Sequence, residues 1–265
     1  MKPFFKPTPV IFARRGGMPS LPADSPEAYH AAIASGAHVI TATARLSADN
    51  ELVLVRENNV LSMTGIDKNI SDMTLAEIKS LDAAYTFKDP LTGEYSYRGK
   101  GISFMTLKEA LEKFPDQRFN VELMDKGKAL PAIFCDIIEE FKAVDRILVY
   151  CSYGSSLRIV RKRLPSSATS LSLMGIIGIY ALFRTGFLYF TPGFRADVLQ
   201  VPEMIGPSFI GNQALIRESS AKGIRIIISL DDSPVQVKRL YESGAHGFIT
   251  NNVPALTAVL DEIPV

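Results

Sequence analysis

The chain has 265 residues, of which 47% are hydrophobic and 22% charged, and its formal net charge is +1 at pH 7. This length is close to the ~250 residues of a single barrel domain, and the composition is that of a globular protein with a sizeable core. The near-neutral charge argues against a broad basic surface, so we expect no nucleic-acid partner.

Short β-rich segments alternate with helical patterns along the whole chain. The candidate strands, in chain order, are Val10–Ala13, Val39–Thr43, Phe119–Leu123, Ile147–Cys151, Ala168–Leu171, Val198–Val201, Arg225–Ser229 and Gly247–Thr250. Helical patterns between them include Pro26–Ser35, Thr106–Phe114, Ala129–Phe141, Gly211–Lys222 and Pro234–Ser243. This alternation predicts an α/β fold, a (β/α)8 TIM barrel formed by a single domain over residues 1–265.

Two features interrupt the alternation after the second strand. Asp49-Asn50 lies between TATARLS and ELVLVRE, which predicts a β-hairpin. If these two residues form the tip of the turn, Thr43 lies opposite Arg56. Residues 60–104 then form a small insertion, and such insertions in barrels usually lie at one end and shape the site.

The most apolar stretch is LSLMGIIGIYALFRTGFLYF, residues 171–190. Arg184 and Gly186 leave about 13 residues free of charge, fewer than the ~20 needed to span a bilayer. We therefore expect a buried helix and no transmembrane span, with an interfacial helix in weak contact with lipid as the alternative. Cys135 and Cys151 lie in apolar segments and no secretory signal is evident, so we expect reduced thiols and a cytoplasmic location.

Active sites of such barrels lie at the C-terminal ends of the strands. The side chains expected there are Arg14, Arg15, Thr41, Thr43, Arg56, Glu57, Glu122, Met124, Ser229 and Asn251. This set holds three arginines and no histidine. His30 falls within a helical pattern, and His38 and His246 precede strands, so all three are expected to lie away from the site.

The ordered motifs resemble those of the glycerophosphodiester phosphodiesterase family over nearly the whole chain. ARRGG is similar to the family's H-R-G-G, LPADSPEAYHAA to its P-E-N-T helix, ITATARLSADNELVLVREN to its L-E-x-D hairpin that returns to H-D, and FNVELM to N-I-E-I-K. GAHGFITNNV is similar to its G-V-D-G-I-I-T-D-x-P. The resemblance implies hydrolysis of glycerophosphodiesters to glycerol 3-phosphate and an alcohol, with two histidines as acid and base and a divalent Ca or Mg ion held by carboxylates.

Transferred position by position, the resemblance places the two catalytic histidines at Arg14 and Arg56. The further family positions are occupied by Thr41 and Thr43 (metal-binding Glu and Asp), Glu57 (the Asp after the second histidine), Met124 (the lysine of E-x-K), Ala23 (the Glu of P-E-N-T) and Ser229 (a tryptophan). Arginine does not release its proton near neutral pH, and neutral hydroxyls bind Ca²⁺ or Mg²⁺ weakly. Of the family's functional set only Arg15 and Glu122 remain, so we expect no intact catalytic residues, no metal site and no cofactor.

The sequence thus favours a family member with a degenerate active site, and it favours a protein without the family's enzymatic activity. The candidate ligand is a phosphate or a glycerophosphodiester-like small molecule, and the ligand-binding candidates are Arg14, Arg15, Thr41, Thr43, Arg56, Glu57 and Glu122. One alternative is an active phosphoric diester hydrolase that uses a displaced site, with Asp125, Asp231 or Asp232 as its acid. Another is a structural or partner-binding barrel, in which the arginines pair internally with Glu57 and Glu122.

Overall fold

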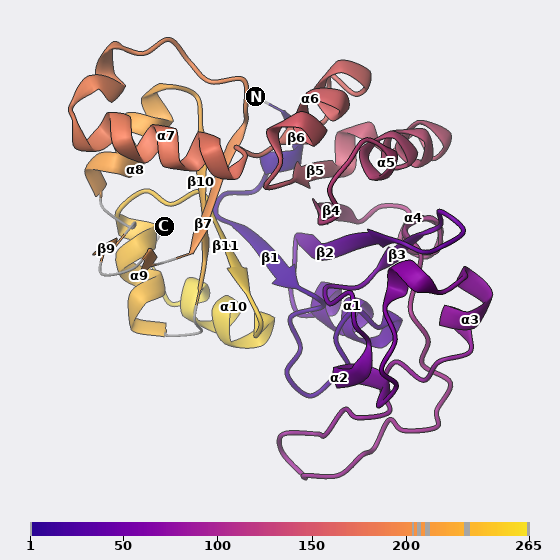
Figure 1. Ribbon diagram of the computed structural model, residues 1–265. Helices are drawn as coiled ribbons and strands as arrows, with labels where there is room; N and C mark the ends of the chain where they lie inside the picture. Colours follow the sequence, from indigo (N-terminus) through magenta and orange to yellow (C-terminus); the bar gives the residue numbers. More distant parts are fainter. Residues whose placement is uncertain (1, 203, 206–207, 210–212, 231–233, 264–265) are drawn as a thin grey trace.

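The computed structural model describes residues 2–202, 204–205, 208–209, 213–230 and 234–263. Parallel strands form a barrel in the order β6-β5-β4-β2-β1-β11-β10-β7, and a bridge between Ser170 and Val198 joins the two ends of this order (Figure 1). The bounds are β1 Val10–Arg14, β2 Val39–Leu46, β4 Arg118–Leu123, β5 Ile147–Tyr150, β6 Ala168–Thr169, β7 Val198–Pro202, β10 Arg225–Ser229 and β11 Gly247–Thr250. The predicted (β/α)8 barrel is confirmed.

Helices follow the strands and cover the outside of the barrel (Figure 1). They are α1 Pro26–Ala34, α4 Leu107–Lys113, α5 Ala129–Glu140, α6 Gly154–Arg163, α7 Leu173–Arg184, α8 Gln213–Ala221, α9 Pro234–Glu242 and α10 Val253–Asp261, with short 3-10 turns η1 Pro3–Phe5, η3 Val144–Arg146 and η4 Phe187–Phe190. β8 (Met204–Ile205) pairs with β9 (Ser208–Phe209) in a separate two-stranded sheet. The predicted helical ranges agree closely with α1, α4, α5, α8 and α9, although Gly211 lies outside the described residues.

Local sequence explains where the helices begin. The Ser25 hydroxyl accepts a hydrogen bond from the backbone N–H of Ala28, and Pro26 occupies the first turn of α1. Thr106 and Glu109 form a reciprocal capping box at the start of α4. These caps satisfy N–H groups that have no partner inside the helix.

Alternate residues of each strand face the interior of the barrel. At the end where the strands begin, Phe12, Leu148 and Ile227 join Phe4 and Phe5 of η1 in one buried apolar cluster. The side chains on the opposite faces of the strands pack beneath the helices in the main core. Because apolar side chains fill the N-terminal end of the barrel, the space available to a ligand lies at the C-terminal end.

The hairpin strand β3 (Leu52–Leu54) pairs with β2 in a register that differs from the predicted one. Ala44 lies opposite Leu54, and the N–H of Val55 donates to the carbonyl of Thr43 at 2.8 Å. Thr43 is therefore opposite Val55, and the prediction of Arg56 is wrong by one residue. The turn holds three residues instead of two, because Asn50 adopts a left-handed conformation with φ 64°.

The insertion carries only short elements, α2 (Leu61–Thr64), η2 (Ile70–Asp72) and α3 (Leu75–Lys79). It forms the lobe beside the hairpin at the lower right of Figure 1. Ile70, Met73 and Phe104 bury themselves with Val53 and Val55 of the hairpin in a small core of their own. The hairpin thus fastens the insertion to the rim of the barrel.

The apolar stretch 171–190 forms α7 and η4, and the expectation of a buried helix is wrong for its outer face. Ile179 is buried, whereas Leu173 and Met174 are 51% and 71% exposed. A twelve-residue helix extends only about 18 Å. In the described part of the chain, no helix is both long enough and apolar enough to cross a bilayer.

His38 and His246 lie where the strands begin, away from the C-terminal end, as the sequence predicts. The Nδ1 atom of His38 accepts a hydrogen bond from the N–H of Ile11 at 3.0 Å, and Nδ1 of His246 accepts one from Ile226 at 3.2 Å. Burial, reinforced by Arg118 at His38 and by Arg225 at His246, lowers the pKa of both imidazoles. Both are therefore neutral, structural acceptors.

This arrangement predicts that acid weakens the fold. Because the pKa of each imidazole is lower in the folded chain than the ~6.5 of the unfolded chain, the unfolded chain binds more protons and stability falls as pH drops below about 6.5. In urea unfolding from neutral to mildly acidic pH, His38→Ala and His246→Ala should each remove part of this loss, on the order of 1 kcal/mol. His30→Ala, at an exposed position on α1, is the control. An unchanged pH dependence in both variants would contradict the assignment.

Candidate functional site

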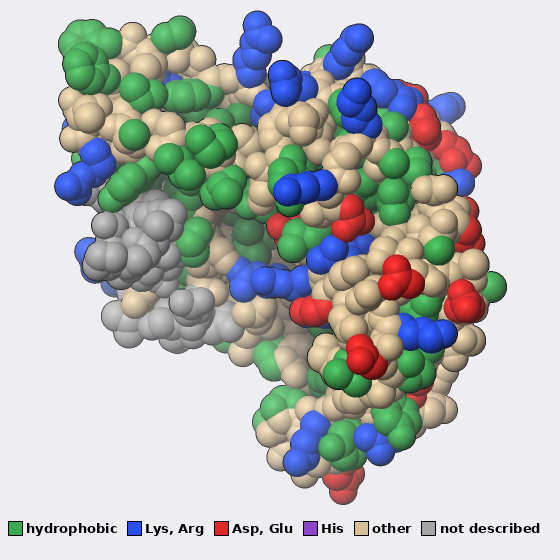
Figure 2. Space-filling view, in the orientation of Figure 1, with side chains coloured by type: hydrophobic (Ala, Val, Ile, Leu, Met, Phe, Trp, Pro, Cys, Tyr) green, Lys and Arg blue, Asp and Glu red, His purple; other side chains and the backbone are tan. Residues whose placement is uncertain are grey.

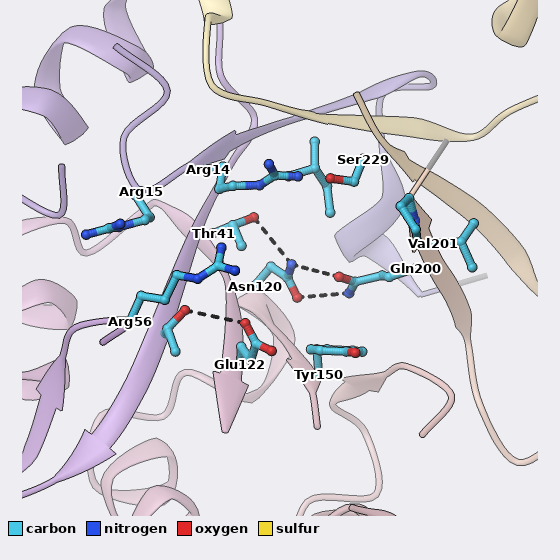
Figure 3. Close-up of a pocket in the computed structure, with 13 residues that line it drawn as sticks. Arg14, Arg15, Thr41, Arg56, Asn120, Glu122, Tyr150, Gln200, Val201 and Ser229 are labelled. Atoms are coloured by element: carbon cyan, nitrogen blue, oxygen red, sulfur yellow. Dashed lines mark hydrogen bonds between the residues drawn. The ribbon is translucent and has the colours of Figure 1, made fainter. Parts of the chain in front are cut away.

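A cavity of about 410 Å³ opens at the C-terminal ends of the barrel strands (Figure 3). Its lining residues are Arg14, Arg15, Thr41, Thr43, Arg56, Asn120, Glu122, Tyr150, Gln200, Val201, Pro202, Ser229 and Ile249. Basic and acidic side chains lie side by side near the centre of the face shown in Figure 2. Most of the predicted site residues therefore converge, whereas Glu57, Met124 and Asn251 are not among the lining residues.

The register of the parallel strands produces this convergence. Arg14 on β1 pairs with Thr41 on β2, and Thr41 pairs with Asn120 on β4. Two residues further along each strand, Thr43 pairs with Glu122. Residues paired across neighbouring parallel strands lie side by side on one face of the sheet, which here is the inner face.

A pair of amides forms a polar layer beneath the arginines. Asn120 donates to Gln200 at 3.2 Å and accepts from it at 3.0 Å, so the two side chains span the barrel interior (Figure 3). Asn120 also donates to the Thr41 hydroxyl at 3.3 Å. Neither amide is among the residues that the sequence predicts at the site. Their period-two spacing from Glu122 and Pro202 would have shown that they face inward.

Glu122 is the carboxylate that faces the cavity in the described lining. Its Oε2 accepts a hydrogen bond from the Thr43 hydroxyl at 3.4 Å. Burial raises the pKa of Glu122, and the positive charge of Arg56 is the main influence that opposes this rise. A buried carboxylate with a raised pKa loses its charge more readily than a surface glutamate, which reduces its repulsion of a bound anion.

Arg14 and Arg56 are the cations directed into the cavity. Figure 3 shows Arg14 extending toward Ser229, and Arg56 extending over Thr41 and Asn120. The Arg56 carbonyl accepts a hydrogen bond from Arg45 at 2.7 Å, while its side chain is exposed. The Arg56 guanidinium forms no ion pair with a carboxylate in the described part of the chain.

Arg15 borders the cavity, but its side chain points away from it (Figure 3). Its Nε donates to Asp24 at 2.7 Å, and its Nη2 lies 3.6 Å from the carboxylate of Glu57. Burial raises the pKa of the Asp24 carboxyl, which the Arg15 charge opposes. Ala23, where the resemblance places a glutamate, is exposed, and the adjacent Asp24 supplies the carboxylate for Arg15. Arg15 and Glu57 therefore belong to this ion-pair network behind the cavity.

The described residues do not form the displaced acidic site that the hydrolase alternative needs. Asp125 pairs with Arg45 at 2.8 Å and accepts a hydrogen bond from the N–H of Leu46 at 3.0 Å, which fastens the loop after β4 to β2. Asp231 and Asp232 lie outside the described residues.

The described lining of the cavity does not fit a divalent metal ion. Hard cations prefer several carboxylate oxygens, but Thr41 and Thr43 offer neutral hydroxyls and Glu122 a single carboxylate. The guanidinium groups of Arg14 and Arg56 in the same cavity repel a cation. Over the described ranges, no group of three or more His, Cys, Asp or Glu side chains could hold a metal ion.

Comparison with known proteins identifies the family. The profile of the glycerophosphoryl diester phosphodiesterase family matches residues 15–255. The chain belongs to this family. A glycerophosphodiester phosphodiesterase from Caldanaerobacter subterraneus subsp. tengcongensis is 24% identical to it over 93% of this chain and 96% of the relative. The lysophospholipase D GDPD1 of Mus musculus is 21% identical over 90% of this chain and 82% of the relative.

Solved structures of glycerophosphodiester phosphodiesterases share the fold of this family member. A glycerophosphoryl diester phosphodiesterase domain from Mycobacterium tuberculosis superposes with a TM-score of 0.82 at 16% identity, over 97% of this chain and 100% of that chain. A phosphodiesterase from Oleispira antarctica, solved with the product sn-glycerol-3-phosphate, superposes with a TM-score of 0.76 at 18% identity, over 96% and 98% of the two chains.

The Arg15–Asp24 ion pair should contribute strongly to the free energy of unfolding. We expect Asp24→Asn, which tolerates the left-handed backbone at this position, to cost about 3 kcal/mol because it leaves a half-buried guanidinium without its nearest carboxylate. Glu57→Gln, which alters the longer and more exposed contact, should cost less than about 1 kcal/mol. Urea unfolding measures both. Equal losses in the two variants would show that Asp24 is not the dominant partner.

Proposed function

We propose that this member of the glycerophosphoryl diester phosphodiesterase family binds a phosphate-bearing small molecule in its barrel cavity and does not hydrolyse it. The observation that carries the proposal is the pair of guanidinium groups, on Arg14 and Arg56, directed into the cavity. The resemblance assigns these two positions to the catalytic histidines. A planar guanidinium is suited to bind phosphate oxygens and is unsuited to accept a proton.

The charges of the cavity support a bound anion. Among the described residues, Arg14 and Arg56 face the cavity together with one carboxylate, that of Glu122, which burial makes easier to protonate. The hydroxyls of Thr41 and Thr43 and the phenol of Tyr150 add neutral hydrogen-bond donors. A volume of about 410 Å³ admits a small phosphate ester. The relative solved with sn-glycerol-3-phosphate suggests glycerol 3-phosphate as the first compound to test.

The loss of acid–base groups supports the absence of hydrolysis. Each general acid or base contributes roughly 10²–10⁴ to the rate of such a reaction, and no side chain of the described cavity replaces the pair of histidines. A metal ion is not a substitute either, because the residues at the corresponding positions do not fit one.

The second candidate function is phosphodiester hydrolysis through rearranged chemistry, which the names of the relatives favour, including the lysophospholipase D. The third is a structural or partner-binding barrel with internally paired arginines. The third candidate accounts for Arg15, which pairs with Asp24 and Glu57. It does not account for Arg56, because Glu57 is absent from the described cavity lining that contains Arg56.

Sulfate distinguishes an anion site from a cation site. Glu122→Gln should raise sulfate affinity about three- to tenfold at neutral pH, because removing a unit negative charge several ångströms away is worth on the order of 1 kcal/mol. Arg56→Gln should lower the affinity about tenfold, and Arg217→Gln, on the exposed side of α8, should not change it. Isothermal titration measures all three, with glycerol 3-phosphate as a second ligand and glycerol as the negative control. Sulfate affinity that is unaffected in both cavity variants would refute the anion site.

Turnover is tested independently of binding. Phosphorus NMR of glycerophosphocholine incubated with the protein, in the presence of Ca²⁺ or Mg²⁺, should show no glycerol 3-phosphate above the uncatalysed control. Product formation that disappears in Asp125→Asn would establish the hydrolase alternative with a displaced acid. Product formation lost in Arg14→Gln or Arg56→Gln would instead place hydrolysis in the cavity itself, and either outcome ends the non-hydrolytic proposal.

A further inference from the structure

The outer face of α7 is apolar, and no described residue of the chain covers it. Ile179 is buried, and Ile176, Tyr180 and Phe183 pack against the main core. On the opposite side, Leu173, Met174 and Ile177 are 51%, 71% and 51% exposed. A helix that is apolar all round is normally buried all round, so this exposed face indicates an apolar surrounding outside the chain.

The apolar surface continues beyond α7 into η4. Phe187, Tyr189 and Phe190 are 61%, 73% and 77% exposed. The ammonium group of Lys222 donates to the carbonyls of Tyr189 at 2.6 Å and Thr191 at 2.8 Å, which fastens η4 to the body of the barrel. Apolar side chains gather over α7 and η4 at the upper left of Figure 2. We use the name apolar face for the exposed side chains of α7 and η4, which are Leu173, Met174, Ile177, Phe187, Tyr189 and Phe190.

The charge of the surrounding segment is strongly one-sided. Residues 147–196 contain Arg158, Arg161, Lys162, Arg163, Arg184 and Arg195, and no Asp or Glu. The net charge of +1 is therefore made up of +6 in this segment and −5 in the rest of the chain. Such a concentration of positive charge beside exposed apolar side chains is typical of segments that bind the surface of anionic membranes.

A second cavity, of about 540 Å³, gathers part of this charge. Its lining includes Arg158, Lys162 and Arg195, and also Asp197, which pairs with Lys2 at 2.9 Å. The side chains of Arg158, Lys162 and Arg195 are exposed, and none of them forms an ion pair with a described carboxylate. Arg195 follows Phe190 by five residues, so the basic cavity and the apolar face are continuous along the chain. Lys and Arg side chains stand along the edge above α6 in the same view as the apolar face (Figure 2).

We propose that the apolar face and the basic cavity together form a docking surface for an anionic phospholipid bilayer. The exposed rings and aliphatic side chains would enter the boundary between headgroups and acyl chains, while Arg158, Lys162 and Arg195 bind lipid phosphates. Charge complementarity selects this occupant over a second copy of the chain, because self-association through the same face would bring two basic segments together. The proposal goes beyond the barrel cavity and does not depend on the ligand bound there.

Flotation with lipid vesicles tests the docking. The protein should float with phosphatidylcholine vesicles that contain about one third phosphatidylglycerol, should float much less with phosphatidylcholine alone, and should release as salt is raised. Failure to float with the anionic vesicles, or equal flotation with both compositions, overturns the proposal. Light scattering of the free protein adds a second criterion, since a dimer abolished by Phe187→Ser/Phe190→Ser, without vesicle binding, would assign the face to self-association.

Matched variants separate the face from general surface effects. Phe187→Ser/Phe190→Ser, and separately Arg158→Glu/Lys162→Glu/Arg195→Glu, should each lower vesicle partitioning by about tenfold or more. The controls make changes of the same kind on the insertion, from apolar to Ser and from basic to Glu. They are Ile66→Ser/Leu91→Ser and Lys68→Glu/Lys88→Glu/Lys100→Glu, where all the side chains are exposed. Losses of equal size in the control variants overturn the proposal.

A readout without loss of function uses the absence of tryptophan from the chain. Phe190→Trp should give tryptophan emission that shifts to the blue on addition of anionic vesicles, because the indole enters a less polar layer. Leu91→Trp, at an 84% exposed position of the insertion, should show no shift. A shift at position 91 without one at position 190 would place the membrane contact elsewhere and refute the docking surface.

Discussion

The parallel register of the barrel strands is the constraint on which the candidate site depends. Arg14, Thr41 and Asn120 come from three strands, and the ladder places them at one level of the barrel. Because side chains alternate along a strand, a shift of a single residue would turn these polar groups outward, under the helices. The apolar cluster at the other end of the barrel, including Phe12, and the helices outside the strands hold this register.

Two adjacent arginines have opposite structural roles. Arg14 ends β1 facing inward, whereas Arg15 adopts a left-handed backbone with φ 54° and turns toward Asp24. A guanidinium that is half buried needs a nearby negative charge, and Asp24 provides one behind the cavity. The Asp24 carboxylate thus pairs with Arg15 instead of facing the cavity. In the described lining, Arg14 and Arg56 face the cavity with one carboxylate, that of Glu122, whose pKa burial raises.

The barrel cavity and the surface around α7, each proposed to bind phosphate groups, differ in construction. The barrel cavity is built on strands and is supported by the hydrogen-bonded amides of Asn120 and Gln200, so its geometry is rigid. The surface around α7 combines exposed rings with Arg158 and Arg195, whose flexible side chains have no described ion-pair partner. The two proposed roles, binding of one small anion and contact with many headgroups, place these different demands on rigidity.

The barrel could be predicted from the sequence, because period-two and helical patterns with caps such as Ser25 are local properties of the chain. The sequence also located Arg14, Thr41 and Glu122 at strand ends, which the topology of a barrel brings together. The direction of the Arg15 side chain could not be predicted in this way, because the fold of a turn brings its partner Asp24 beside it. The tertiary structure likewise decided the one-residue shift of the hairpin and the inward amides, because loop geometry and contacts across the barrel are not local. Burial of α7 was decided in the same way: its composition is apolar on both sides, and only packing shows which side the protein leaves uncovered.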